Sequence, residues 1–180
     1  MKLRLSYSLL QTWQRGDVDR AVQMYFRMDS PTTRQLEEGK EMHKEISSHI
    51  ELHRRLPDYM PQIPLSNPLP DKVVIVSYNE LFDLKAIYDC LDGETLHEYK
   101  SGVSTSSDYA NSDQIPFYFL VDEMTSQSLK KAYLIHHNQY TKKNDFVLVW
   151  KSDRLIEKAK NLIDSIGPEI YAHFKKEGLI

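Results

Sequence analysis

The stretch from residue 86 to residue 100, Ala86-Ile-Tyr-Asp-Cys-Leu-Asp-Gly-Glu-Thr-Leu-His-Glu-Tyr-Lys100, decides the fold of this chain. It contains Asp92-Gly93, a strong signal for a tight turn between antiparallel strands. The residues on either side are rich in the apolar and aromatic types that strands favour. The sequence therefore predicts a hairpin whose two strands are Leu81–Leu91 and Glu94–Ser101.

This hairpin is predicted to bring charged side chains together. If the turn centres on Asp92-Gly93, then Asp89 and Glu98 are diagonal neighbours, about 7–8 Å apart between their backbones, and share a face with Lys100. Two carboxylates this close repel, so one is held neutral or a cation lies between them. Oxygen ligands of this kind suit Mg²⁺ or Mn²⁺, and a lysine beside the cation suits phosphoryl chemistry. The alternative is a hairpin with ordinary solvent-exposed charges.

Outward from the hairpin, the pattern predicts helices first and then a sheet. Residues 1–56 are expected to form a helical lobe, in which Asp17 or Asp19 caps a helix through Val18–Met28 and a long solvated helix runs from Thr33 to about Arg55. Residues 57–70 contain five prolines and form an extended connector.

The remaining chain, residues 71–151 and 152–180, is predicted to form the sheet and a final helix. A loop is expected at 102–110. Besides the hairpin, we expect three strands and two helices, at Lys72–Asn79, Asn111–Gln127 (helix), Lys131–Asn138, Asp145–Lys151 and 153–176 (helix). The fold class is therefore α/β, with a mixed central sheet of about five strands flanked by helices, in a single domain over residues 1–180.

Composition excludes several classes of protein. The chain has 180 residues with 27% charged side chains, and a mean hydropathy of −0.54 predicts no membrane span. One cysteine, Cys90, excludes a disulfide framework or a four-cysteine cluster within the chain. The opening residues do not resemble a signal peptide, so we expect a cytoplasmic protein, or one in the host cytoplasm if it is viral. The net charge of −3 alone argues weakly against avid nucleic-acid binding.

Four short motifs in order resemble those of the PD-(D/E)XK nuclease superfamily. They are Gly39-Lys-Glu-Met-His43, Asp89 at the end of a strand, Glu98-Tyr99-Lys100, and Gln114-Ile-Pro-Phe-Tyr118. In this order they resemble the G-x-x-x-H, D, E-x-K and Q-x-x-x-Y motifs of its RecB-like and Cas4-like exonuclease branch. Each motif alone is weak, whereas four in order on the expected element types are much stronger.

The resemblance implies a restriction-endonuclease-like core and metal-dependent hydrolysis of DNA. It implies that Asp89, Glu98 and the Tyr99 carbonyl bind Mg²⁺ or Mn²⁺, that His43 approaches the same cation, and that Lys100 orients the attacking water. By the same resemblance, the residues that contact the substrate strand or brace the site are Gln114 and Tyr118.

The resemblance also has departures and open alternatives. Cas4-type members and some helicase–nuclease subunits hold an iron–sulfur cluster with four cysteines, so Cys90 alone implies the cluster-free type. No ATP-binding loop is present in the sequence. An exonuclease on single strands or DNA ends is the first hypothesis. An inactive nucleic-acid-binding or assembly subunit is the second, and a phosphoesterase acting on RNA is a weaker third. A homo-oligomer or a repair or recombination partner remains open.

Other clusters have plainer interpretations. His49 and His53 are spaced for a metal pair but are expected to be solvated, and His136-His137 are expected to point to opposite faces of a strand. Basic pairs at 54–55, 130–131, 142–143 and 175–176 could form a rim for a DNA backbone. Aromatic residues that could stack on unpaired bases are Tyr7, Trp13, Tyr25 and Tyr109.

Overall fold

The structure is a computed structural model. It describes residues 2–28, 34–101, 105–125, 128–138 and 140–180. The expected helix start at Thr33, the expected helix end at Gln127 and part of the expected loop at 102–110 lie outside these residues.

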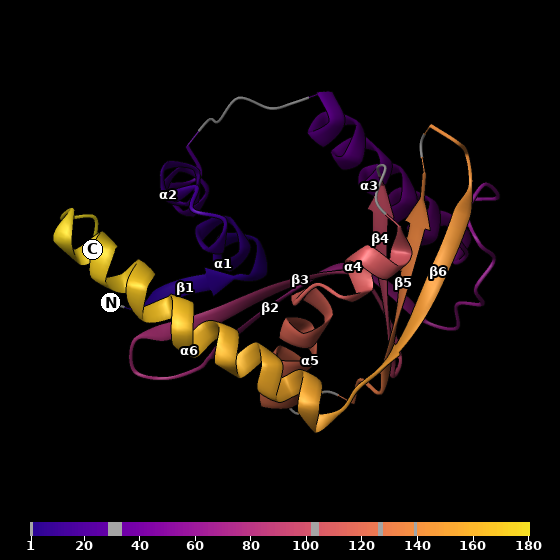
Figure 1. Ribbon diagram of the computed structural model, residues 1–180. Helices are drawn as coiled ribbons and strands as arrows, with labels where there is room; N and C mark the ends of the chain where they lie inside the picture. The colour runs from indigo at the N-terminus through magenta and orange to yellow at the C-terminus, as the bar shows by residue number, and fades with distance from the viewer. Residues whose placement is uncertain (1, 29–33, 102–104, 126–127, 139) are drawn as a thin grey trace.

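Twelve helices and strands follow one another along the described chain (Figure 1). They are β1 (Leu3–Ser6), α1 (Tyr7–Gln14), α2 (Val18–Phe26), α3 (Arg34–His53), β2 (Pro68–Ser77), β3 (Phe82–Asp92), β4 (Thr95–Ser101), α4 (Ser106–Ala110), α5 (Gln114–Met124), β5 (Lys131–His137), β6 (Asn144–Trp150) and α6 (Asp153–Lys176).

The architecture is a mixed six-stranded sheet flanked by helices. The α/β class is confirmed, but the expected count of about five strands omitted β1, whose four residues we had assigned to a helix. β1 alternates buried and exposed residues, a period of two that four residues are too few to reveal. The expected loop at 102–110 also contains α4, which is held by a capping box between Thr105 and Asp108.

The helix predicted to follow Asp17 begins at Val18 as expected, but it ends at Phe26 rather than at the expected Met28. Asp17 caps α2, because its side chain accepts a hydrogen bond from the backbone amide of Arg20. No helix in the described part of the chain has the length and apolar content needed to cross a membrane.

One edge of β3 is divided between two strands, and this division positions the site. β2 is antiparallel to β3 and pairs with it from Asp83 to Asp92. The other edge pairs first with β1, which is parallel, at residues 82–85 and then with β4, which is antiparallel, at residues 90–92. On this edge, residues 86–89 of β3 therefore lie in the gap between the segment that pairs with β1 and the segment that pairs with β4. β4 and β5 are parallel, as expected for strands joined by a helical crossover.

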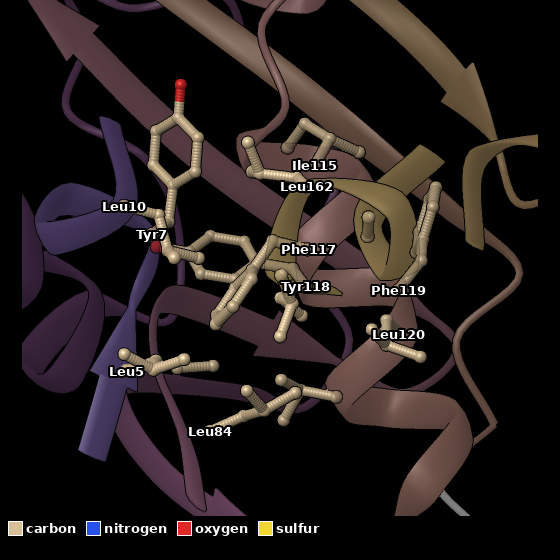
Figure 2. Close-up of a cluster of buried hydrophobic side chains, with 14 of the residues drawn as sticks. Leu5, Tyr7, Leu10, Leu84, Ile115, Phe117, Tyr118, Phe119, Leu120 and Leu162 are labelled. Atoms are coloured by element: carbon tan, nitrogen blue, oxygen red, sulfur yellow. The ribbon is translucent and has the colours of Figure 1, made fainter. Parts of the chain in front are cut away.

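Two hydrophobic cores cover the two faces of the sheet. Helices α1, α2, α5 and α6 pack with β1 and β3 in the larger core, where Leu5, Leu84 and Phe117 are fully or almost fully buried (Figure 2). Helix α3 packs through Met42, Ile46 and Ile50 against the other face, in a smaller core that also contains Cys90 and Tyr99. The site described below lies where α3 and α5 approach the sheet from opposite faces.

Strand β3 changes its facing at Asp89. The even-numbered residues from Phe82 to Tyr88 belong to the larger core, but beyond Asp89 it is Leu91 that belongs to it. On β2, the register places Asp71 opposite Asp89, and Asp71 has a left-handed backbone with φ of 52°. Irregularities of this kind redirect a strand's side chains. Asp89 is thus the residue at which β3 switches faces.

Candidate active site

The hairpin that carries the site has a different register from the expected one. The observed pairs are Cys90–His97, Leu91–Leu96 and Asp92–Thr95, so the turn is Gly93-Glu94 and the expected centre at Asp92-Gly93 is wrong by one residue. Gly93 takes the left-handed conformation, with φ of 58°.

Asp92 belongs to the strand because its side chain has another role. Its carboxylate accepts hydrogen bonds from the backbone amides of Ser66 and Asn67 and so anchors the connector before β2. Continued by the same register, Asp89 and Glu98 come to lie opposite each other rather than diagonally.

The Glu98 carboxylate is the buried centre of the site. Its side chain is 1% exposed. Oε1 accepts two hydrogen bonds, from Lys100 Nζ at 2.7 Å and from Gln114 Nε2 at 2.6 Å. Oε2 is buried and has no hydrogen-bond partner among the described residues. A buried carboxylate oxygen without a partner is costly, so this oxygen is available for a cation.

Asp89 is held from two sides. Its Oδ2 accepts a hydrogen bond of 2.7 Å from the backbone amide of Tyr99, and its Oδ1 lies 3.5 Å from Nδ1 of His43. The first contact ties the end of β3 to β4, and the second ties it to α3. The structure therefore brings Asp89, Glu98, Lys100 and His43 together, although they come from three different elements.

Helix α5 supplies the support for Glu98. Gln114 is the first residue of α5, and its Nε2 also lies 2.9 Å from the hydroxyl of Tyr118, one turn later. Tyr118 is 6% exposed and packs edge-on against Tyr88 of β3. Because Tyr118 is fixed in the core, it orients the Gln114 amide toward the carboxylate.

Helix α3 approaches the end of β4 closely at Gly39. A Cβ atom at this position would lie 3.4 Å from Oγ of Ser101. His43 follows one turn later, with its side chain one-third exposed. The G-x-x-x-H spacing therefore places a small residue at the closest approach and the histidine beside Asp89.

The pKa values of the two carboxyl groups move in opposite directions, and those of His43 and Lys100 are both raised. Burial and the neighbouring Asp89 raise the pKa of Glu98 to about 7. Burial opposes ionisation of Asp89, but His43, Lys100 and the Tyr99 amide outweigh it and lower the pKa of that carboxyl. Burial likewise opposes the charged forms of His43 and Lys100, yet the carboxylates raise the pKa of both. Diverging pKa values in one cluster are typical of functional sites.

The donor set fits a hard divalent cation. Within the described residues, no three His, Cys, Asp or Glu side chains are arranged to hold a metal ion. Two carboxylates, one with an unpartnered buried oxygen, match the small number of protein ligands that Mg²⁺ uses beside water and phosphate oxygens. The fit therefore rests on Asp89 and Glu98.

Two clefts reach the site, and Ser8 lines both of them. One, of about 480 Å³, contains Lys100 and Gln114, and the other, of about 740 Å³, contains His43. The first cleft is also lined by residues that sequence reasoning did not assign, Gln11 and Arg15. Their spacing from Tyr7 at steps of four is a helical signal that could have identified them.

The cysteine and the other histidine pairs singled out in the sequence fall outside the site, whereas two of the aromatic candidates line one of its clefts. Cys90 is fully buried, as expected of a small hydrophobic residue. The rings of His49 and His53 lie 4.5 Å apart on α3, and Nδ1 of His136 lies 2.9 Å from Asp145. Of the aromatic residues proposed for base stacking, those that line the Lys100 cleft are Tyr7 and Tyr109.

Comparison with known proteins supports the fold. No protein-family model matches the chain, and no curated protein sequence matches it. Among solved structures, an alkaline exonuclease from Laribacter hongkongensis, LHK-Exo, is similar with a TM-score of 0.58 at 9% identity, covering 98% of this chain and 93% of that one.

Two further structures agree with this comparison. LHK-Exo in complex with dAMP gives a TM-score of 0.57 at 10% identity, covering 96% and 90% of the two chains. A phage-related exonuclease from Haemophilus somnus 129PT gives 0.52 at 11% identity, covering 95% and 82%. The chain thus has the same fold as these exonucleases over almost its whole length.

Proposed function

We propose that this protein is a nuclease that uses Mg²⁺ or Mn²⁺ to hydrolyse phosphodiester bonds in DNA. The observation that carries the proposal is the buried Glu98 carboxylate, with Lys100 and Gln114 on one oxygen, no partner on the other, and Asp89 opposite. A surface hairpin with solvated charges has no reason to bury such a group. The exonuclease fold of the structural neighbours points to the same chemistry.

The cation would be held by the carboxylates of Asp89 and Glu98 and the backbone carbonyl of Tyr99, with His43 beside it. When bound, it would stabilise negative charge on the phosphate and favour deprotonation of a water. Because the superfamily resemblance rests on these residues and the E-x-K pattern, we assign the chain to the PD-(D/E)XK nucleases, in the RecB-like branch without an iron–sulfur cluster.

Lys100 would position the attacking water. Its Nζ is 2.7 Å from Glu98 Oε1, and its side chain is 20% exposed toward the cleft. A lysine with a raised pKa stays charged, so it orients a water and stabilises the developing charge rather than acting as a base. Gln114 and Tyr118 hold the glutamate in place, and His43 does the same for Asp89.

The substrate we favour is single-stranded DNA or a DNA end, cleaved exonucleolytically. The support is that Lys100 lies in a cleft of limited size, about 480 Å³, which also contains Tyr7 and Tyr109. Two tyrosine rings in a small cleft suit an unpaired base, since every base offers a face for stacking.

The test is a cleavage assay on end-labelled single- and double-stranded DNA with Mg²⁺, Mn²⁺ or chelator. We expect cleavage only with metal, and a loss of at least a hundredfold in Lys100→Ala and Asp89→Asn. Glu94→Gln is the matched control, because Glu94 lies in the same hairpin, is 51% exposed and pairs with Lys130. It is expected to cleave as the wild type does.

Four results would contradict the proposal. Cleavage in chelator, or full activity in Lys100→Ala, would remove the assigned roles. Binding without cleavage of any DNA would favour an inactive nucleic-acid-binding subunit, and cleavage of RNA alone would change the substrate. The ladder of products from one labelled end gives the polarity.

A further inference from the structure

Away from the site, a further cleft gathers positive charge, although the chain as a whole has a net charge of −3. It has a volume of about 380 Å³ and lies between β1, β3 and the end of α2. Four cationic residues line it, and no carboxylate does within the described residues. We call it the basic groove, and these residues are Lys2, Arg4, Arg27 and Lys85.

Three of the four cations have no ion-pair partner among the described residues. Lys2 lies 3.8 Å from Asp83, but the side chains of Arg4, Arg27 and Lys85 make no ion pair with any described residue. They converge from three elements that are far apart in the sequence. Because the net charge of the chain is −3, a local concentration of unpaired cations needs a counterpart, and an anion is the ligand it fits.

The basic groove lies in line with the candidate active site. Lys85 alternates with the buried residues of β3, so it faces away from the larger core, toward the side on which α3 contributes His43. Figure 1 shows β3 running from below α1 and α2 toward α3. Between Lys85 and Asp89 lies only Ile87 on this face, and it is 44% exposed.

The distance between Lys85 and Asp89 is short enough for one nucleic-acid strand to contact both the basic groove and the candidate active site. Lys85 and Asp89 are four residues apart on β3, which is about 13 Å along a strand at 3.3 Å per residue. We infer that the basic groove binds phosphates of the DNA strand a few nucleotides away from the phosphate being cleaved. This inference rests on the proposed function, and it adds a second contact region that sets a minimum substrate length.

The test measures DNA binding without cleavage. Fluorescence anisotropy in chelator with labelled strands of 3, 6, 12 and 20 nucleotides compares the wild type with Arg4→Gln/Lys85→Gln. We expect the double variant to bind the 12- and 20-nucleotide strands about 10- to 100-fold more weakly at 0.1 M salt, and the slope of log K against log salt to fall by about 1.4 to 1.8. Binding of the 3-nucleotide strand should not change.

The matched control is Arg154→Gln/Lys160→Gln, which removes two charges from solvent-accessible positions on α6, outside the basic groove. Urea denaturation of each variant verifies that the fold is kept. Equal losses in the two double variants, an equal loss at all lengths, or no binding of DNA by the wild type would overturn the inference. Because the measurement is made in chelator, it stands apart from the cleavage assay: a protein that binds through the groove but never cleaves contradicts only the proposed function.

Discussion

Replacing Glu98 with glutamine should make the metal-free protein more stable while removing its activity. The structure gives the reason: a fully buried carboxylate opposite Asp89, with its pKa raised from an ordinary 4.5 to about 7. Because the pKa is raised, ionisation of Glu98 destabilises the folded state relative to its protonated form. The contribution of Glu98 to the free energy of unfolding is fully present below pH 4.5 and is lost as the pH rises to 7. Over this interval of about 2.5 units, the loss is about 3 kcal/mol.

Glu98→Gln keeps the shape of the neutral form and avoids this loss. Urea unfolding in chelator at pH 8 should show the variant to be more stable than the wild type by about 3 kcal/mol, a midpoint shift of about 1–3 M. At pH 5 the difference should fall below about 1 kcal/mol, because the wild-type group is then mostly protonated in the fold. The control is again Glu94→Gln, which should leave the stability within about 0.5 kcal/mol.

Added Mn²⁺ should reverse the order. At a concentration 100 times its dissociation constant, a bound ion stabilises the wild type by about 2.7 kcal/mol, whereas Glu98→Gln should gain little. A variant that is no more stable than the wild type at pH 8 in chelator would refute the reasoning about Glu98. A variant that gains as much from Mn²⁺ as the wild type would refute its role as a ligand.

Three further substitutions are expected to have measurable effects. Gln114→Ala should lower activity by about 10- to 100-fold with little loss of stability, measured by cleavage rate and urea midpoint. Lys151→Met should cost about 3–5 kcal/mol, because Lys151 Nζ lies 3.0 Å from the fully buried carboxylate of Asp122; the exposed Lys158→Met should cost less than about 1 kcal/mol, and an equal cost in both would contradict this account. His97 is buried and its pKa is lowered to about 4, so its contribution is present above pH 6.5 and lost by about 3 kcal/mol as the pH falls to 4. His97→Phe should show a smaller loss over that range in urea unfolding at each pH, and an unchanged pH profile would contradict the shift.

Much of the fold could be predicted because its long elements carry strong local patterns. The pattern behind α6 continues for 24 residues, and β3 follows a clear alternation as far as Tyr88. The sequence could not reveal β1, because it is held by partners about 80 residues away rather than by its own pattern. Nor could it reveal the hairpin register, since Asp92 serves a loop 25 residues before it.

The candidate site, too, could be predicted only where local sequence patterns determine it. The spacing of Gln114 and Tyr118 within one helix was enough to predict that they share a face, and the structure adds their contacts with each other and with Glu98. The burial of Glu98 and the contact between His43 and Asp89 depend on tertiary packing. Gln11 and Arg15 were missed because they belong to no motif and gain meaning only when α1 lies beside Lys100.

The divided edge of β3 also has a consequence for how the chain is made. β1 leaves the ribosome first, but its partner residues, Phe82–Lys85, follow about 80 residues later. At 5–20 residues per second, this strand waits about 4–16 s before it can pair. Because such a distant pairing is slow to form, the cleft beside β3 is completed late in folding, and an early fragment of the chain lacks the complete candidate site.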